Sequence, residues 1–204
     1  MDTVAYGLEF CQYAPVWFMP MPSKSRLSRD RWIEAALDAL ANGGVAAVAV
    51  EPLAAHLGVT KGSFYWHFRD RDELLAAALE EWEERGTERL IKQLDQIADP
   101  RERLTEWARR VLSADKAQLA ALHAAAEHPI VSPVLRRTTE RRIQYLAALL
   151  QEAGVPRSAA RRRARLLYSA DLGLYQIARA LDARRPTERE LRPLVREISD
   201  AFLR

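Results

Sequence analysis

The sequence predicts an all-α protein of about nine helices, in which an amino-terminal helix-turn-helix bundle of three helices precedes a larger carboxy-terminal helical domain. Gly and Pro are sparse, at 8 and 10 of 204 residues, whereas the strong helix formers Ala, Leu, Arg and Glu dominate the chain. Signals that start and stop helices recur along the whole sequence, and no convincing strand appears.

The first predicted helix is capped by Ser28 and ends at Asn42-Gly43-Gly44. Its apolar residues recur at helical spacing and are Trp32, Ile33, Ala36, Leu37 and Leu40. A short second helix begins near Glu51-Pro52, because Pro is tolerated in a first turn, and Gly58 stops it.

Thr60 is the predicted cap of a third short helix that runs through Phe68. Asp70 and Glu73 form a capping box for a long fourth helix, which we expect to reach Leu94 or Ile97. The later helices are predicted to begin at 99–100, to span 115–128, 132–154 and 156–182, and to begin again at 187 with a Thr-Glu cap.

The composition limits the class of protein. Hydrophobic residues make up 49 % and charged residues 29 %, as in an ordinary globular protein, and the net charge of +3 permits a nucleic-acid partner without demanding one. The single Cys11 excludes an intrachain disulfide and a cysteine-based zinc site. No apolar run approaches the ~20 residues of a membrane helix. We therefore expect a cytoplasmic protein with no membrane partner.

Three regions differ in character. Residues 1–22 contain three prolines, scattered aromatic side chains and no helical period, so they are predicted to form a disordered extension. An arm that packs on a partner is the alternative. Residues 23–72 are assigned to the helix-turn-helix domain and residues 73–204 to the carboxy-terminal helical domain.

The segment GVTKGSFYWHFRDRDELL, which starts at Gly58, concentrates aromatic rings between basic residues. Two short helices joined by a tight turn with Gly form a helix-turn-helix, whose second helix presents its amino-terminal side chains to base edges. Phe64 and Phe68 are four residues apart and are expected to pack inward. Tyr65, Trp66 and His67 then point elsewhere, where their polar groups suit phosphates and thymine methyl groups. A core corner with incidental basic neighbours is the alternative interpretation.

Residues 28–79, with LAAHLGVTKGSFYWHFRDRDELL at their centre, resemble the DNA-binding domain of the TetR family of transcriptional regulators. The resemblance covers about a quarter of the chain. It implies nine or ten helices, of which three bind DNA, and a carboxy-terminal domain that binds a small effector and forms a homodimer through its last two helices. It also implies a sequence-specific regulator, in most cases a repressor, that binds a palindromic double-stranded operator and is released by the effector.

The resemblance assigns DNA contacts to residues of the turn, the third helix and the start of the fourth helix: Thr60, Lys61, Gly62, Ser63, Tyr65, Trp66, His67 and Arg71. Arg71 stands where the family has a Lys that holds a phosphate. The chain departs from the family at Ala49-Val50-Glu51, where a Thr or Ser is common. Glu51 would repel a phosphate, so contact from that helix end is in doubt.

Candidate effector-binding residues are bulky rings and ionisable groups of the second domain: Trp107, His123, Tyr145, Tyr168, Asp171 and Tyr175. The rings also suit an ordinary core. Asp171 lies in an apolar run and needs a partner, either a cationic or hydroxylated ligand, a Tyr hydroxyl, or an Arg across the dimer. The small residues of 156–182 suit a dimer interface or simple packing, and the Arg run at 161–165 suits a solvated face or a second nucleic-acid contact.

No catalytic motif, metal site or cofactor is predicted. His123, Glu127 and His128 raise the question of a metal, but only the first two share a helix face, so a structural role is favoured. The chain shows no Gly-rich phosphate loop, nucleophile elbow or zinc spacing, so we do not expect an enzyme. Two alternatives remain: an architectural DNA-binding factor without an effector, and a helical enzyme acting on a small molecule.

Overall fold

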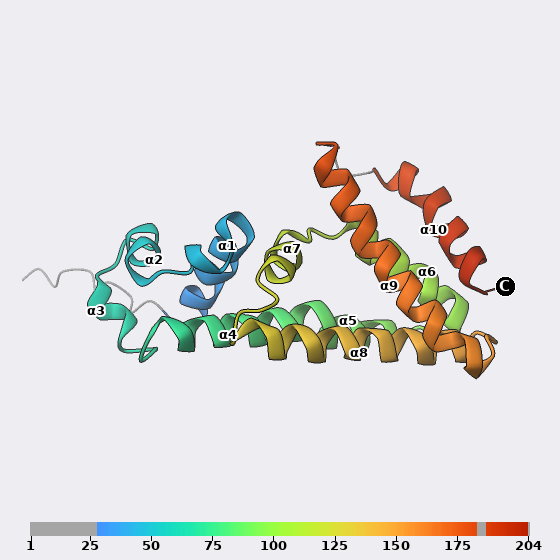
Figure 1. The fold of residues 1–204 in the computed structure, drawn as a ribbon, viewed down its shortest axis with the longest axis horizontal. Coiled ribbons are helices and arrows are strands. Elements are labelled where there is room, and N and C mark those ends of the chain that lie inside the picture. The colour runs from blue at the N-terminus through green and yellow to red at the C-terminus, as the bar shows by residue number, and fades with distance from the viewer. Residues whose placement is uncertain (1–27, 183–186, 204) are drawn as a thin grey trace, which may run out of the picture.

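The computed structural model describes residues 28–182 and 187–203, so the predicted extension over 1–22 lies outside the described residues. All regular structure in the described part is helical, as expected (Figure 1). Its elements are α1 (Arg29–Ala47), α2 (Val50–His56), α3 (Lys61–Phe64), α4 (Arg71–Glu83), η2 (Glu84–Glu88), α5 (Arg89–Leu94), α6 (Pro100–Ser113), α7 (Ala117–Ala124), α8 (Val131–Glu152), α9 (Arg157–Ala180) and α10 (Glu188–Leu203). Because α4, η2 and α5 form one continuous rod, the described chain contains nine helical rods.

The predicted caps position the first helices. The Ser28 hydroxyl accepts the backbone N–H of Arg31 at 3.4 Å, which closes the start of α1. Gly44 interrupts α1 with φ 69° and ψ −166°, a conformation that is essentially limited to glycine. Asp70 caps α4, because its carboxylate accepts the N–H of Glu73 at 2.8 Å. The Glu73 side chain reaches back one residue further than in a capping box and accepts the N–H of Arg69 at 2.9 Å.

The turn of the helix-turn-helix depends on Gly58. Its φ of 67° lies in the left-handed region, where glycine carries no steric penalty. The Gly58 N–H donates to the Ala55 carbonyl at 3.2 Å, and the Val59 N–H donates to the Ala54 carbonyl at 3.0 Å. These two bonds form a Schellman motif, which ends α2 and sets the direction of α3.

Several helix boundaries differ from the sequence prediction. The Thr60 hydroxyl caps nothing, because its own carbonyl accepts the Ser63 N–H at 2.9 Å instead. The third helix ends at Phe64 rather than Phe68, since the Phe64 carbonyl accepts the N–H groups of both His67 and Phe68 and closes a turn there. The helix predicted over 115–128 is shorter, as α7 spans Ala117–Ala124.

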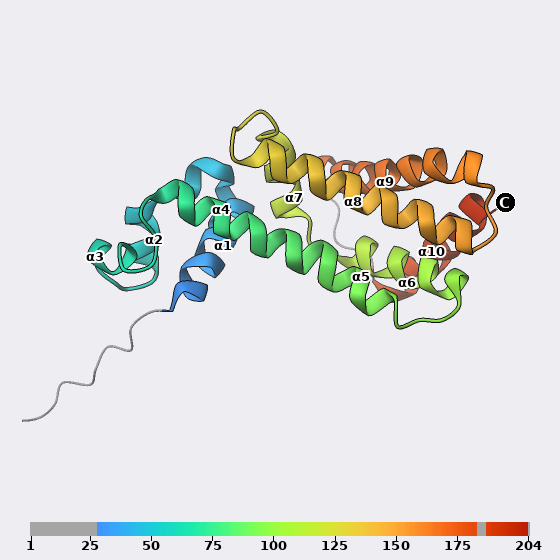
Figure 2. The same cartoon turned by 90° about the horizontal axis from the view of Figure 1, so that it is seen from below.

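The rod α4–η2–α5 and the long helix α8 lie side by side along the long axis of the molecule (Figures 1 and 2). One hydrophobic cluster joins α1–α4 to α7 and the start of α8, and a second joins α5, α6, α8, α9 and α10. The first cluster extends well past residue 72 and includes Leu74, Leu79 and Trp82 of α4 and Leu119 and Leu122 of α7. The amino-terminal helices therefore pack directly on the rest of the chain, and the domain limits stay a proposal.

The Arg run at the start of α9 is tied to neighbouring helices. Arg161 forms an ion pair with Glu140 of α8 at 2.6 Å, and Arg163 donates to the Phe202 carbonyl of α10 at 3.0 Å. These contacts give two of the arginines a structural role. Among the helices of residues 28–182 and 187–203, none is long and apolar enough to span a membrane.

Gly44→Ala is expected to lower the free energy of unfolding by about 1–3 kcal/mol, because a side chain is strained in this backbone conformation. No heavy atom lies within 4 Å of the added Cβ, so the loss reports backbone strain alone. Gly62→Ala is the control, since Gly62 has no positive φ and its Cβ would meet only the Thr60 hydroxyl at 3.7 Å. Urea unfolding of both variants checks the prediction, and equal stabilities would contradict it.

Candidate DNA-binding surface and ligand cavity

The aromatic segment that follows the turn divides between core and surface. Phe64 and Phe68 are buried, at 0 % and 2 % exposure, and their rings stack with centroids 5.5 Å apart. The Phe64 ring also meets Trp32 of α1 edge-to-face at 5.3 Å, a favourable geometry for aromatic pairs. Tyr65 and Trp66 are 56 % and 78 % exposed. The predicted division of the rings is therefore present in the fold.

Most of the residues assigned to DNA lie in α3 or directly before and after it. Thr60, Lys61 and Gly62 are exposed, and Ser63 and His67 are half-buried. Together with Tyr65 and Trp66 they form what we call the α3 surface: residues 60–63 and 65–67. The α3 surface combines a cation, a helix start and polar rings, which are the groups that contact phosphates and base edges.

Lys61 and Glu51 form an ion pair across this surface. The Lys61 ammonium lies 2.7 Å from the Glu51 carboxylate, and both side chains are largely exposed. The hydrogen bond from Lys61 lowers the pKa of Glu51, and the same bond raises the pKa of Lys61. Glu51 thus forms an ion pair with the Lys61 ammonium group that is assigned to DNA. The residue that departs from the family pattern therefore neutralises part of the positive charge of the α3 surface.

Arg71 has a structural role that the sequence did not indicate. Its guanidinium donates to the carbonyls of Val48 at 2.9 Å and Val45 at 2.5 Å, and a further N–H donates to Asp72 at 2.9 Å. These bonds fasten α4 to the segment between α1 and α2. The assigned phosphate contact stays a prediction, and a phosphate would have to share or replace these partners.

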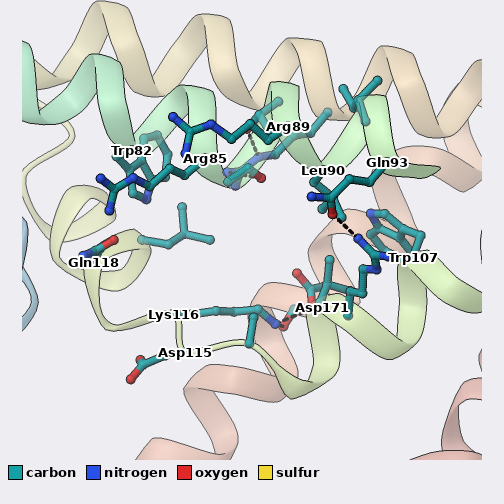
Figure 3. A pocket seen from close by; sticks show the side chains of 18 of the residues that line it. Trp82, Arg85, Arg89, Leu90, Gln93, Trp107, Asp115, Lys116, Gln118 and Asp171 are labelled. Carbon is teal, nitrogen blue, oxygen red and sulfur yellow. Dashed lines mark hydrogen bonds and ion pairs between the residues drawn. The ribbon is translucent and has the colours of Figure 1, made fainter. Parts of the chain in front are cut away.

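A cavity of about 530 Å³ lies between helices of both hydrophobic clusters, within the ~300–1,000 Å³ typical of small-molecule sites (Figure 3). Its wall includes parts of α1, α4, η2, α5, α6, α7, α8 and α9. Four predicted effector residues line it: Trp107, Tyr145, Tyr168 and Asp171. His123 and Tyr175 do not line it. Both are half-buried in other parts of the fold. Burial lowers the pKa of His123.

The partner of Asp171 is Lys116, which none of the three sequence-based alternatives included. The Lys116 ammonium donates to the Asp171 carboxylate, and the two side chains are 9 % and 8 % exposed (Figure 3). Burial raises the pKa of Asp171, and the charges of Lys116 and Arg142 offset part of that rise. The pair therefore links the start of α7 to the middle of α9 in the wall of the cavity.

Arg142 of α8 contacts the π-helical segment η2. Its Nε donates to the Thr87 hydroxyl at 2.8 Å, a terminal nitrogen donates to the Gly86 carbonyl at 3.2 Å, and its guanidinium lies 5.0 Å from the ring centre of Trp82. In the described residues no carboxylate lies within salt-bridge distance of Arg142. The guanidinium is thus placed in the cavity wall by neutral partners and an aromatic face.

Sequence reasoning missed Lys116 and Arg142. Arg142 precedes Tyr145 by three residues, so the two share a face of α8, and this spacing was the available signal. Lys116 gave no signal, because Asp171 is 55 residues away and only the packing of α7 near α9 joins them. The π-helical segment that supplies Arg85, Gly86 and Thr87 to the wall also has no marker in the sequence.

The three residues considered as metal ligands, His123, Glu127 and His128, do not form a metal-binding cluster in the described part of the chain. The His128 ring nitrogen Nδ1 accepts the Ile130 N–H at 3.3 Å, close to the start of α8, while Glu127 is exposed. Over 28–182 and 187–203 no three His, Cys, Asp or Glu side chains are grouped so that they could hold a metal ion.

Comparisons with known proteins agree with the geometry of the amino-terminal helices. Residues 33–78 match the family described as bacterial regulatory proteins, tetR family. An uncharacterised helix-turn-helix type transcriptional regulator of Pseudomonas putida, TtgW, is 37 % identical over 57 residues. This alignment spans 28 % of the chain and 42 % of TtgW, so the match covers less than half of that relative.

Solved structures extend the similarity to the whole fold. A transcriptional regulator from a Rhodococcus species is 26 % identical, with a TM-score of 0.68, over 87 % of this chain and 96 % of that chain. A Saccharomonospora viridis protein described as a transcriptional regulator was crystallised in complex with choline. It is 22 % identical, with a TM-score of 0.67, over 85 % of this chain and 92 % of that chain.

Lys116→Met is expected to lower the free energy of unfolding at pH 7.5 by about 3 kcal/mol, because it leaves the buried Asp171 carboxylate without its counter-ion. The substitution raises the pKa of Asp171 further, so the folded variant takes up a proton as the pH falls. The deficit relative to wild type is therefore largest at pH 7–8 and shrinks toward the unfolded pKa near ~4.

The matched control removes both charges. Lys116→Met combined with Asp171→Leu is expected to recover most of the loss, since an apolar pair of similar volume replaces a buried ion pair at little cost. Denaturant unfolding of the single and double variants at pH 5 and 7.5 provides the measurement. A deficit that is independent of pH, or a double variant no more stable than Lys116→Met, would refute the expectation.

Proposed function

We propose that this chain, which belongs to the TetR family of bacterial transcriptional regulators, is a repressor that binds a palindromic operator as a homodimer and is released by a small effector. The observation that carries the proposal is the α3 surface. Its ring segment is anchored by the buried Phe64 and Phe68, while Lys61 is exposed at the start of α3 and Tyr65 and Trp66 are exposed directly after its end. This arrangement suits insertion of α3 into a major groove.

Exposed apolar side chains on α9 support the homodimer. Leu166 and Ile177 of α9 are 62 % and 58 % exposed, and Leu181, the residue that follows α9, is 73 % exposed. Leu166 and Ile177 are eleven positions apart, about three helical turns, so they lie on one face of α9. A second copy of α9, together with α10, would remove this face from water and place two α3 surfaces on one side of a DNA duplex.

Residues of α1 line the cavity, and this supports release of the protein from DNA by an effector. Glu34 and Leu37 of α1 belong to the cavity wall. Glu34 forms an ion pair with Arg85 of η2, and the Leu37 carbonyl accepts a hydrogen bond from Gln118 of α7 at 3.2 Å. A ligand that prefers an altered position of these groups would shift α1, and with it α3, away from the DNA-binding arrangement.

The cavity favours a ligand-responsive regulator over an architectural DNA-binding factor, for which no ligand-sized cavity is expected. The structurally similar protein that was solved with choline supports small organic molecules as ligands of this fold. The matches to transcriptional regulators favour a regulator over the enzyme alternative.

Selection of DNA sites from a random library by the purified protein, at stated salt, tests the proposal. We expect recovery of a two-fold symmetric site whose half-sites lie about one helical turn, ~34–36 Å, apart. Analytical ultracentrifugation with the selected duplex should give two chains per site. Recovery of no site above background would count against a sequence-specific regulator and favour an architectural factor.

Opposite effects are expected from the two members of the surface ion pair. Lys61→Ala removes a cation from the α3 surface and is expected to weaken binding of the selected site about tenfold or more per dimer. Glu51→Gln frees the Lys61 ammonium and removes a charge that repels phosphate, so it is expected to strengthen binding several-fold, in the range of one or two charge contacts.

Fluorescence anisotropy at two salt concentrations measures these affinities. Lys92→Ala is the control, because Lys92 forms a similar exposed pair, at 3.4 Å from Glu84, away from α3. Its affinity should stay within about twofold of wild type, as expected for a charge outside the contact surface. Weaker binding by Glu51→Gln would show that the carboxylate does not compete with DNA for Lys61.

A further inference from the structure

We propose that the cavity takes a small organic anion, a carboxylate on an apolar or aromatic body, with the Arg142 guanidinium as the group that receives its charge. The inference deepens the proposed function, since it rests on the cavity being the effector site and names the chemical class of the effector. The charge balance of the wall, the partners of Arg142 and the apolar part of the lining support it.

The wall carries more cations than anions. Its basic residues are Arg85, Arg89, Arg110, Lys116 and Arg142, and its acidic residues are Glu34, Asp115 and Asp171. Four of the basic residues have carboxylate partners. Arg85 pairs with Glu34, Arg89 with Glu81, Arg110 with Glu106 and Lys116 with Asp171. Their charges are therefore largely compensated before any ligand enters.

Arg142 differs from these four. It has hydrogen bonds to the Thr87 hydroxyl and the Gly86 carbonyl, and no carboxylate of the described chain pairs with it. A guanidinium has five N–H donors, and these two bonds leave several of them for a ligand. An oxyanion is the group that a guanidinium binds most strongly, because charge and paired N–H donors act together.

The acidic residues of the wall do not offer an equivalent site to a cation. Asp171 is already paired with Lys116, so an ammonium ligand would have to displace a buried intrachain partner. Glu34 is engaged by Arg85. Asp115 accepts the Ala117 N–H at 2.9 Å at the start of α7, and in Figure 3 its carboxylate points away from Trp82 and Arg85.

The remaining wall suits the body of such a ligand. Trp107 and Leu90 lie on the opposite side of the view from Trp82 and Gln118 in Figure 3, and Ile91 and Val111 add apolar surface. Tyr168 is 6 % exposed, and its hydroxyl is buried with no hydrogen-bond partner in the described residues. A buried hydroxyl without a partner is unfavourable. A hydrogen bond from the Tyr168 hydroxyl to a ligand oxygen, after a small rotation of the side chain, would therefore stabilise the complex.

Three probes with one body and different head groups test the class: 4-phenylbutanoate, 4-phenylbutan-1-ol and 4-phenylbutylammonium. Isothermal titration of the full chain without DNA is expected to show the carboxylate binding at least tenfold more tightly than the alcohol and the ammonium. Arg142→Met should remove that preference. Arg142→Lys, which keeps the charge but not the paired donors, should retain part of it.

Two further variants separate ligand contact from folding. Tyr168→Phe removes a hydroxyl that bonds nothing in the fold, so it should stay folded while losing about threefold or more of the carboxylate affinity, as expected for one hydrogen bond. Lys92→Met is the matched control, because Lys92 forms an exposed pair with Glu84 at 3.4 Å and does not line the cavity. Its carboxylate affinity should stay within about threefold of wild type, since a compensated charge contributes little.

The outcomes are distinct from those of the DNA experiments. Tighter binding of the ammonium or the alcohol, binding of none of the three probes, or an unchanged preference in Arg142→Met would overturn the anion assignment. A chain that selects an operator but prefers the ammonium probe keeps the proposed function and loses this ligand class. A chain that prefers the carboxylate but selects no DNA site loses the regulator proposal and keeps the ligand class.

Discussion

The continuity of the rod α4–η2–α5 is the constraint on which the rest of the structure depends. The rod begins at the Asp70 cap beside α3 and ends at Leu94 near the end of α6. Its first part supplies Leu74, Leu75 and Leu79 to the amino-terminal cluster, and its last part supplies Leu94 to the second cluster. Because one helix belongs to both clusters, the position of α3 is tied to the packing of the ligand cavity.

The π-helical turn η2 lies at the middle of this rod and forms part of the cavity wall. Arg85, Gly86 and Thr87 of η2 line the cavity, and residues of α5 directly after them continue the wall. Arg142 fastens this turn through the Gly86 carbonyl and the Thr87 hydroxyl. The least regular part of the rod is thus the part that carries the site.

Local signals explain why much of the fold could be predicted from the sequence. Ser28, Asp70 and Asp99 cap helices through bonds to residues two or three positions away, and Gly58 sets its turn by its own φ. The split between Phe64 and Trp66 follows from helical spacing. Each of these features is decided within a few residues, so a single sequence contains it.

The cavity could be predicted only in part, because its charges depend on tertiary pairing. Trp107, Tyr145, Tyr168 and Asp171 were recognisable as unusual residues, but Lys116 becomes a partner of Asp171 only when α7 packs near α9. Asp171 is a candidate ligand contact in the sequence, and the structure shows that it also forms a buried ion pair with Lys116. Tyr175 has the same residue type as Tyr145 and Tyr168 of the wall, but neither Tyr175 nor His123 lines the cavity.

The buried pair also restricts how a ligand can act on α3. Lys116 is the N-cap residue of α7, and two residues later Gln118 donates to the Leu37 carbonyl of α1. Any ligand that draws Lys116 away from Asp171 must compensate a buried carboxylate, which costs several kcal/mol. A ligand that binds Arg142 leaves this pair intact and acts on η2 instead, at the centre of the rod that carries α3. We therefore expect a bound anion to shift α3 by moving η2 and α4, because a movement of α7 would cost the free energy of separating Lys116 from Asp171.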